Sequence, residues 1–117
     1  MSCHIKSIKK RADFVNLSTK GISSPQKGLV LQSRSNIVES NNKFIRFGVT
    51  ATKKIGNAVV RNKCKRKLRA LAKDILVLYA KENNDYVLIA RSTTYDRNMS
   101  LLKLDLINAL KELKLTK

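Results

Sequence analysis

The sequence predicts an α/β (α+β) fold in a single domain, with elements in the order helix, strands, helix, strand, helix. Apolar residues recur at helical spacing after residue 57 and again after residue 101, whereas residues 44–52 and 86–90 have the composition and spacing of strands. The chain has 117 residues, of which 43% are hydrophobic, and this is enough for one domain around one core.

The chain is strongly basic: it has 25 lysines and arginines against 8 acidic residues, which gives a net charge of +17. Such a charge indicates a polyanionic partner, with nucleic acid as the first expectation and a membrane surface as the second. No apolar run approaches the roughly 18 residues of a membrane span, and the N-terminus lacks the apolar core of a signal peptide. We therefore expect a cytoplasmic protein that binds no membrane.

The N-terminal region begins with a flexible basic arm, predicted for residues 1–10, and residues 11–117 are expected to form the folded domain. A short helix is predicted for residues 11–19, with Gly21 beyond its end, and Phe14 is its one aromatic residue. Phe14 is equally compatible with a core position and with stacking on an RNA base.

A metal site in the protein is not expected. The two cysteines, Cys3 and Cys64, form no C-x-x-C pair, and the only histidine, His4, lies beside Cys3 in the basic arm. Cys64 falls on the apolar stripe of the central helix, which makes it a core residue. The sequence therefore predicts no metal and no cofactor bound by the protein itself.

Residues 23–26 have the composition of a turn, with two serines and a proline. Residues 29–33 alternate like a half-buried strand, in which Leu29 and Leu31 face inward and Gln32 faces the other way.

A polar hairpin loop is predicted at residues 39–42, and the clearest strand of the chain, residues 44–52, follows it. The apolar face of this strand holds Ile45, Phe47, Val49 and Ala51. The other face holds Arg46, Gly48, Thr50 and Thr52. This second face is small and polar with one cation, which suits a groove for a nucleic-acid backbone.

The central helix is the most basic segment of the chain. Asn57 is a suitable N-cap, and the helix is predicted to run to about Ala80, with Asn83 and Asn84 as its stop. Its apolar stripe consists of Val60, Cys64, Leu68, Leu71 and Ile75. The rest of its circumference is almost wholly positive.

The basic face of this helix opposes helix formation. Three like-charged pairs lie four residues apart on it: Arg61–Lys65, Lys65–Arg69 and Lys63–Lys67. Each such pair costs about 0.2–0.5 kcal/mol, so apolar packing must hold the helix, and a polyanion would relieve the repulsion. Solvated helix faces usually alternate in sign, so this face favours contact with nucleic acid.

Residues 86–90 form a continuous apolar run, as expected for a strand that is covered on both faces. Arg91 ends this run, a loop is predicted at residues 93–98, and a final amphipathic helix follows. The apolar stripe of that helix is Leu102, Leu106, Ala109, Leu110 and Leu113.

Two motifs in the central segment carry a resemblance to a known family. Residues 53–59 read KKIGNAV, and residues 61–69 follow the pattern RNxxKRxxR. Together they resemble the signature of the bacterial ribonuclease P protein component, in which the basic run is called the RNR motif. The match is long and ungapped, and the resemblance extends from about Ile5 to the C-terminus.

The resemblance implies a small mixed sheet with a left-handed βαβ crossover, although such connections are normally right-handed. It also implies the protein subunit of the endoribonuclease ribonuclease P, whose partner RNA carries the active site and binds the Mg²⁺ ions. The protein would bind this catalytic RNA and the 5′ leader of precursor tRNA. It would thereby assist the removal of the leader that makes the mature tRNA 5′ end.

By the same resemblance, the basic run would bind the RNA subunit and a cleft would bind the leader. The residues expected to bind the RNA subunit are Arg61, Asn62, Lys63, Lys65, Arg66, Lys67 and Arg69. The residues expected to bind the leader are Phe14, Gln32, Arg46, Thr50, Lys53, Lys54 and Arg61. The family often has aromatic residues where this chain has Ser18 and Gln32, so the cleft is less aromatic than usual.

The residues themselves agree with a protein that does not catalyse. One histidine and eight acidic residues include no paired carboxylates at a spacing suited to metal-dependent hydrolysis. Charge and composition fit a structural RNA-binding protein of the ribosomal type equally well, and only the motif separates these two functions. A DNA-binding module ranks last, because a nearly all-cationic helix face contacts phosphates rather than base edges.

Overall fold

The structure, a computed structural model, describes residues 4–7, 21–35, 44–82 and 84–116. The described elements are β1 (His4–Ser7), β2 (Ile22–Pro25), β3 (Leu29–Ser35), β4 (Phe44–Thr50), the 3₁₀ turn η1 (Lys53–Ile55), α2 (Ala58–Tyr79), β5 (Asn84–Ala90) and α3 (Met99–Glu112). The helix predicted at residues 11–19 and the hairpin loop predicted at residues 39–42 lie outside the described residues. Neither described helix is long and apolar enough to cross a membrane.

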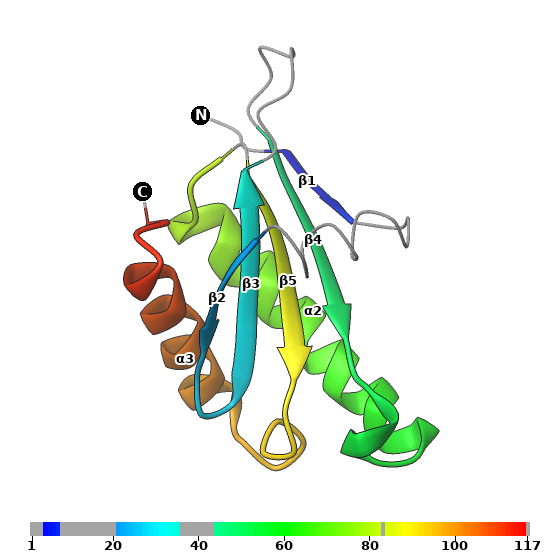
Figure 1. The fold of residues 1–117 in the computed structure, drawn as a ribbon. Coiled ribbons are helices and arrows are strands. Elements are labelled where there is room, and N and C mark those ends of the chain that lie inside the picture. Colours follow the sequence, from blue (N-terminus) through cyan, green and yellow to red (C-terminus); the bar gives the residue numbers. More distant parts are fainter. Residues whose placement is uncertain (1–3, 8–20, 36–43, 83, 117) are drawn as a thin grey trace.

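The strands form one mixed sheet in the order β1-β4-β5-β3-β2 (Figure 1). The pairs β1–β4 and β4–β5 are parallel, whereas β3–β5 and β2–β3 are antiparallel. Strand β5 therefore lies at the centre. Both of its faces are buried at Asp85, Tyr86, Val87 and Leu88, as the apolar run predicts.

The connection from β4 to β5 has the unusual hand. The two strands are parallel neighbours, and α2 joins them across one face of the sheet. In Figure 1 both strands point down, β5 lies to the left of β4, and α2 runs behind the sheet. This arrangement is a left-handed crossover and confirms the expectation from the family resemblance, although about 98% of such connections are right-handed.

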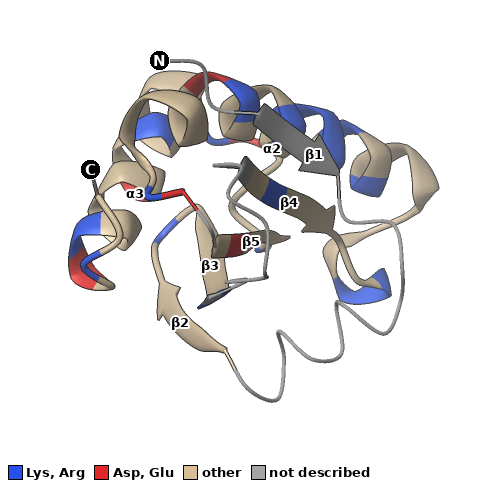
Figure 2. Cartoon of the chain, turned by 90° about the horizontal axis from the view of Figure 1, so that it is seen from above, with Lys and Arg blue, Asp and Glu red and all other residues tan. Residues whose placement is uncertain are grey.

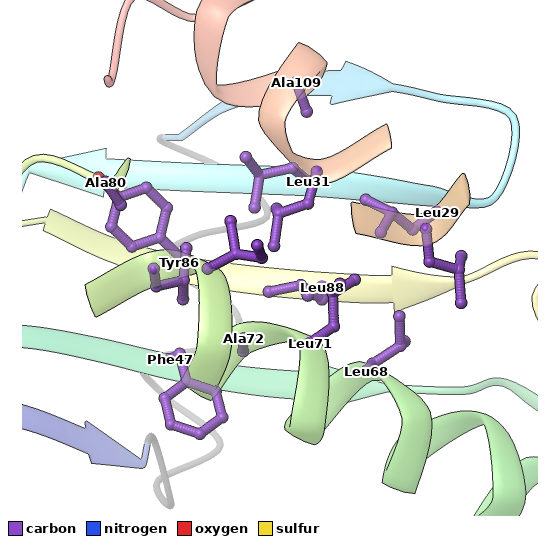
Figure 3. Close-up of a cluster of buried hydrophobic side chains, with 14 of the residues drawn as sticks. Leu29, Leu31, Phe47, Leu68, Leu71, Ala72, Ala80, Tyr86, Leu88 and Ala109 are labelled. Atoms are coloured by element: carbon purple, nitrogen blue, oxygen red, sulfur yellow. The ribbon is translucent and has the colours of Figure 1, made fainter. Parts of the chain in front are cut away.

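The hydrophobic core fills the space between the sheet and the two helices, which cover the same face (Figure 2; Figure 3). Helix α2 buries Cys64, Leu68, Leu71, Ala72, Ile75 and Leu76, and α3 buries Leu102, Leu106, Ala109 and Leu110 as apolar residues. Burial of one leucine side chain contributes about 1.5–3 kcal/mol. Three like-charged pairs on α2 together cost about 0.6–1.5 kcal/mol, so packing of the stripe outweighs their repulsion.

The ends of both helices agree with the sequence. The Asn57 side chain accepts a hydrogen bond from the backbone N–H of Val60 at 3.0 Å and thereby caps α2. Asn98 caps α3 in the same way, through the N–H of Leu101 at 2.9 Å. Helix α2 ends at Tyr79, one residue before the predicted end.

Two short strands differ from the sequence-based expectation. The turn predicted at residues 23–26 is wrong, because residues 22–25 form the edge strand β2 and the chain turns at residues 26–28. The proline that suggested a turn is tolerated in an edge strand, which needs no ladder partner on its outer side. Residues 4–7, predicted within the basic arm, form β1 beside β4, a strand that starts 40 residues later (His4 pairs with Phe44).

Candidate RNA interface

The KKIGNAV motif forms the turn that starts α2. Its two lysines and Ile55 make η1, and Gly56 follows with φ of 151°, in the region that favours glycine. A Cβ atom at Gly56 would also lie only 3.1 Å from the Val60 side chain. The motif therefore brings Lys53 and Lys54, both exposed, directly to the N-terminal end of the basic helix.

The basic residues of α2 lie outside the core stripe, as predicted. Arg66 and Arg69 are exposed together with Asn62 and Lys63, whereas Arg61, Lys65 and Lys67 are half-buried. Figure 2 shows the lysines and arginines distributed along α2, on the far side of the molecule from β2 and β3. The structure thus brings the seven residues expected to bind the RNA subunit onto one helix.

Two of the six cations among these seven residues have partners within the protein. The ammonium Nζ of Lys67 donates to the backbone carbonyl oxygens of Thr94 (2.8 Å), Tyr95 (3.0 Å) and Arg97 (2.6 Å). Burial lowers the pKa of Lys67, and the positive charge of Lys63 lowers it further. Lys63 Nζ lies 4.2 Å from the centre of the Tyr95 ring, in a cation–π contact.

The sheet face opposite the helices collects three of the predicted leader-binding residues. The register places Gly48, Val87, Gln32 and Ser23 in one row across the sheet, with Arg46, Asp85 and Arg34 in a second row and Thr50, Ile89, Val30 and Pro25 in a third. Gln32, Arg46 and Thr50 therefore share one face, as predicted. Of the other four, Lys53 and Lys54 lie in η1, Arg61 lies in the first turn of α2, and Phe14 lies outside the described residues.

The sequence predicts Arg46 as the one cation on its face of β4, and the structure adds a buried acid beside it. Arg46 Nε donates to Asp85 Oδ1 at 2.8 Å, and Nη2 donates to Asp85 Oδ2. The Asp85 side chain is fully buried, whereas 27% of the Arg46 side chain is exposed. Sequence reasoning missed Asp85, because only the register of β4 against β5 shows that the two residues are opposite each other.

Two further arginines offer buried polar atoms. Arg34 Nε and Arg61 Nε are buried and have no hydrogen-bond partner within the described part of the chain. Both residues are half-buried. Arginine presents five donors in a planar fork that matches a phosphate group, which suits both residues to a phosphate backbone.

The structure offers no cluster of metal-ligating side chains among the described residues. No three histidine, cysteine or acidic side chains of the described ranges lie together as metal ligands. Cys64 is fully buried, and this burial raises the pKa of its thiol. Asp105, one of the two acids that are buried in the described part of the chain, pairs with Arg97 at 2.6 Å, and the other, Asp85, pairs with Arg46.

Comparisons with known proteins point to one family. A family model described as Ribonuclease P matches residues 4–114. The ribonuclease P protein component of Paramagnetospirillum magneticum is 36% identical over 112 residues, which is 95% of this chain and 84% of that protein.

Two solved structures have the same fold. The RNase P protein of Staphylococcus aureus superposes with a TM-score of 0.76 at 32% identity, over 95% of this chain and 97% of that one. The RNase P protein from Thermotoga maritima gives a TM-score of 0.75 over 92% of this chain and 96% of that one. Its identity is 24%, so this second likeness concerns the fold alone.

Proposed function

The chain belongs to the ribonuclease P protein family, and from this membership we propose that it acts as the protein subunit of ribonuclease P in the cytoplasm. In this role it binds the catalytic RNA subunit and the 5′ leader of precursor tRNA. It thereby assists the cut that releases the leader and makes the mature tRNA 5′ end. The observation that carries the proposal is the family match over residues 4–114, nearly the whole chain.

Catalysis is assigned to the partner RNA, and the Mg²⁺ ions that activate water are bound by that RNA. The protein offers little for this chemistry, since it has one histidine and eight acidic residues. Two of these acids, Asp85 and Asp105, are held by arginines, so neither is available as a metal ligand without breaking an ion pair. We expect the protein alone to leave precursor tRNA uncut at every magnesium concentration.

The RNA-subunit interface is assigned to the basic face of α2. The proposed contacts are Arg61, Asn62, Lys65, Arg66 and Arg69, with Lys63 beside them. The helix has no acidic residue before Asp74, so this face is strongly positive. Long-range attraction between this positive charge and RNA phosphates favours rapid association. Lys67 is left out of this set, because its three donors already bond to backbone carbonyls.

The leader site is assigned to the sheet face opposite the helices, together with the N-terminal end of α2. Gln32, Arg46 and Thr50 share that face, and Lys53 and Lys54 follow directly after β4. Phe14 and Arg61 complete the proposed set. Because few of these groups are able to read base edges, binding should depend on the length of the leader more than on its sequence.

We also propose that residues 1–10 act as a basic arm and that residues 11–117 form one domain. Strand β1 falls within that arm and pairs with β4, so the arm would be joined to the sheet at residues 4–7.

Reconstitution tests the proposal. The protein is mixed with an in vitro transcript of ribonuclease P RNA, and cleavage of precursor tRNA is compared with that of either component alone. We expect the RNA to cleave precursor tRNA and the protein to accelerate this cleavage at low magnesium. The protein alone should cleave nothing. Tight binding to ribosomal RNA without any effect on ribonuclease P RNA would favour a structural protein of the ribosomal type instead.

A second experiment tests the leader site. Precursors with leaders of increasing length are bound to the reconstituted complex, with and without Phe14→Ala. Stacking of one base on an aromatic ring is worth about 1–3 kcal/mol, so the variant should weaken precursor binding about tenfold or somewhat more. Mature tRNA lacks the leader and should bind unchanged. Equal losses for mature and precursor tRNA would assign Phe14 to the core.

A further inference from the structure

The segment between β5 and α3 is docked against α2 by one lysine. The ammonium of Lys67 reaches three carbonyl oxygens of residues 94–97, at distances between 2.6 and 3.0 Å. An ammonium group has three donors, so Lys67 has no donor left for a phosphate. The pyramidal arrangement of these donors suits three converging carbonyls, which a planar guanidinium does not match.

The same segment is fixed on its other side by the turn between β2 and β3. Thr94 Oγ1 donates to the Gly28 carbonyl at 2.6 Å, and Arg91 Nη1 donates to the Gln26 carbonyl at 3.0 Å. Gly28 leaves no room for a Cβ atom, which would clash with Asp105 Oδ2 and Arg97 Cδ. The turn therefore packs directly on the ion pair between Arg97 and Asp105. Residues 94–97 are therefore held between the β2–β3 turn and α2.

This docking covers one flank of the basic helix. At 100° per residue, Lys63 and Lys67 lie about 40° apart on the same flank, and Lys65 lies about 160° from Lys67 on the other. The Tyr95 ring lies against Lys63. Asp96 in the same segment brings a carboxylate close enough to act on the charge of Lys67. A carboxylate and a protein segment at Lys67 disfavour the approach of phosphates to that lysine, whereas Lys63 is exposed at the edge of the covered flank.

The opposite flank has the reverse properties. It carries Arg61, Lys65 and Arg69, spaced four residues apart along one side of the helix. None of these three forms an ion pair with a residue in the ranges that the structure describes. Their charges repel one another, and phosphates relieve this repulsion.

We infer that the RNA subunit docks on the flank of α2 that carries Arg61, Lys65 and Arg69, and that Lys67 clamps residues 94–97 instead of contacting RNA. The inference rests on the proposed function, because it names which part of the basic helix meets the RNA. It assigns different roles to cations that are only two residues apart and equal in charge.

A matched pair of variants tests this assignment. Lys65→Gln and Lys67→Gln each remove one positive charge from the same turn of α2. The affinity of each variant for a transcript of ribonuclease P RNA is measured at several salt concentrations, and hydrogen exchange is followed at the amides of residues 94–97. Lys67→Arg, which keeps the charge, is the third variant.

The expected outcomes differ for the two lysines. Lys65→Gln should make the plot of log affinity against log salt shallower by about 0.7–0.9, the loss of one phosphate contact. Lys67→Gln and Lys67→Arg should keep the wild-type slope and accelerate exchange at residues 94–97, because neither side chain satisfies three carbonyls. A shallower slope for Lys67→Gln that Lys67→Arg restores would overturn the inference.

Two further results would also count against it. An unchanged slope for Lys65→Gln would overturn the choice of flank, and unchanged exchange in both Lys67 variants would overturn the clamp. Failure of the proposed function has a different signature: the wild-type protein would not prefer ribonuclease P RNA over an unrelated RNA of equal length. Exchange at residues 94–97 would still test the clamp in that case.

Discussion

The two faces of the sheet are made by the same strands, yet their chemistry differs. The face under the helices presents large apolar side chains that meet α2 and α3, among them Leu29, Leu31, Phe47, Tyr86 and Leu88 (Figure 3). The other face is mixed: it presents Gln32, Arg34, Arg46, Thr50 and Asp85 beside the apolar Val30, Val87 and Ile89. Because side chains alternate along a strand, every residue of one face is flanked by residues of the other.

The comparison separates stability from recognition. The helix-covered face gains stability by excluding water, and an unpaired charge there is costly. The opposite face tolerates a buried acid because an arginine neutralises it with two hydrogen bonds.

A charge on the covered side should have the largest effect. Cys64→Asp places a carboxylate at a fully buried position of α2, where removal of its hydration costs several kcal/mol. A domain of this kind is stable by only about 5–15 kcal/mol, so we expect the variant to be largely unfolded at neutral pH. Circular dichroism during thermal denaturation measures this.

Cys64→Ala is the control for that variant, because it keeps the position apolar and should remain folded. If Cys64→Asp unfolds cooperatively with a melting temperature within a few degrees of the wild-type value, this side of the helix is more hydrated than its burial implies.

On the opposite face, loss of the buried acid should have an intermediate effect. Asp85→Asn keeps the shape of the side chain but removes the negative charge from the two hydrogen bonds that Arg46 donates, and we expect a loss of about 1–3 kcal/mol in unfolding free energy. Urea denaturation measures it. The double variant Arg46→Gln/Asp85→Asn should lose less than the sum of the single changes, because the pair is coupled. Additive losses would argue against coupling.

Exposed cations of α2 should change binding and leave stability almost unchanged. Arg66→Ala and Arg69→Ala lie far from the core stripe, so each should alter unfolding free energy by less than about 0.5 kcal/mol. Each should make the salt dependence of RNA affinity shallower by about 0.7–0.9. A large drop in melting temperature with wild-type RNA affinity would contradict this assignment.

The smallest effect concerns pH. Burial raises the pKa of the Cys64 thiol above its ordinary value of 9.0, so the folded chain keeps a proton that the unfolded chain loses above pH 9.0. Stability should therefore fall as pH rises past that value. Burial lowers the pKa of Lys67 below 10.5, so between its folded pKa and 10.5 the unfolded chain binds more protons, and stability should rise with pH.

These two contributions oppose each other and are separated by mutation. Urea denaturation between pH 8 and pH 10 should give a shallower loss of stability for Cys64→Ala than for the wild-type protein. Lys67→Gln should give a steeper loss. Identical pH profiles for the wild-type protein and Cys64→Ala would rule out a contribution from the buried thiol.

Local patterns determined much of this protein from the sequence alone. The start of α2 depends on Asn57 and Gly56, and its orientation depends on a stripe of apolar residues at helical spacing, so both follow from neighbours within a few turns. The alternation of residues 44–50 likewise predicted which face of β4 enters the core. Strand pattern failed at β2, where small polar residues and a proline resemble a turn.

Only the tertiary structure decided what the individual cations do. Lys67 looks like every other cation in its helix, and its partners lie 27 to 30 residues further along the chain. The acid that neutralises Arg46 lies 39 residues away and is reached only through the register of β4 and β5. The left-handed crossover is equally non-local. Helical and strand periodicity report the environment of a residue along its own element, whereas the partner of a charge depends on which elements pack together.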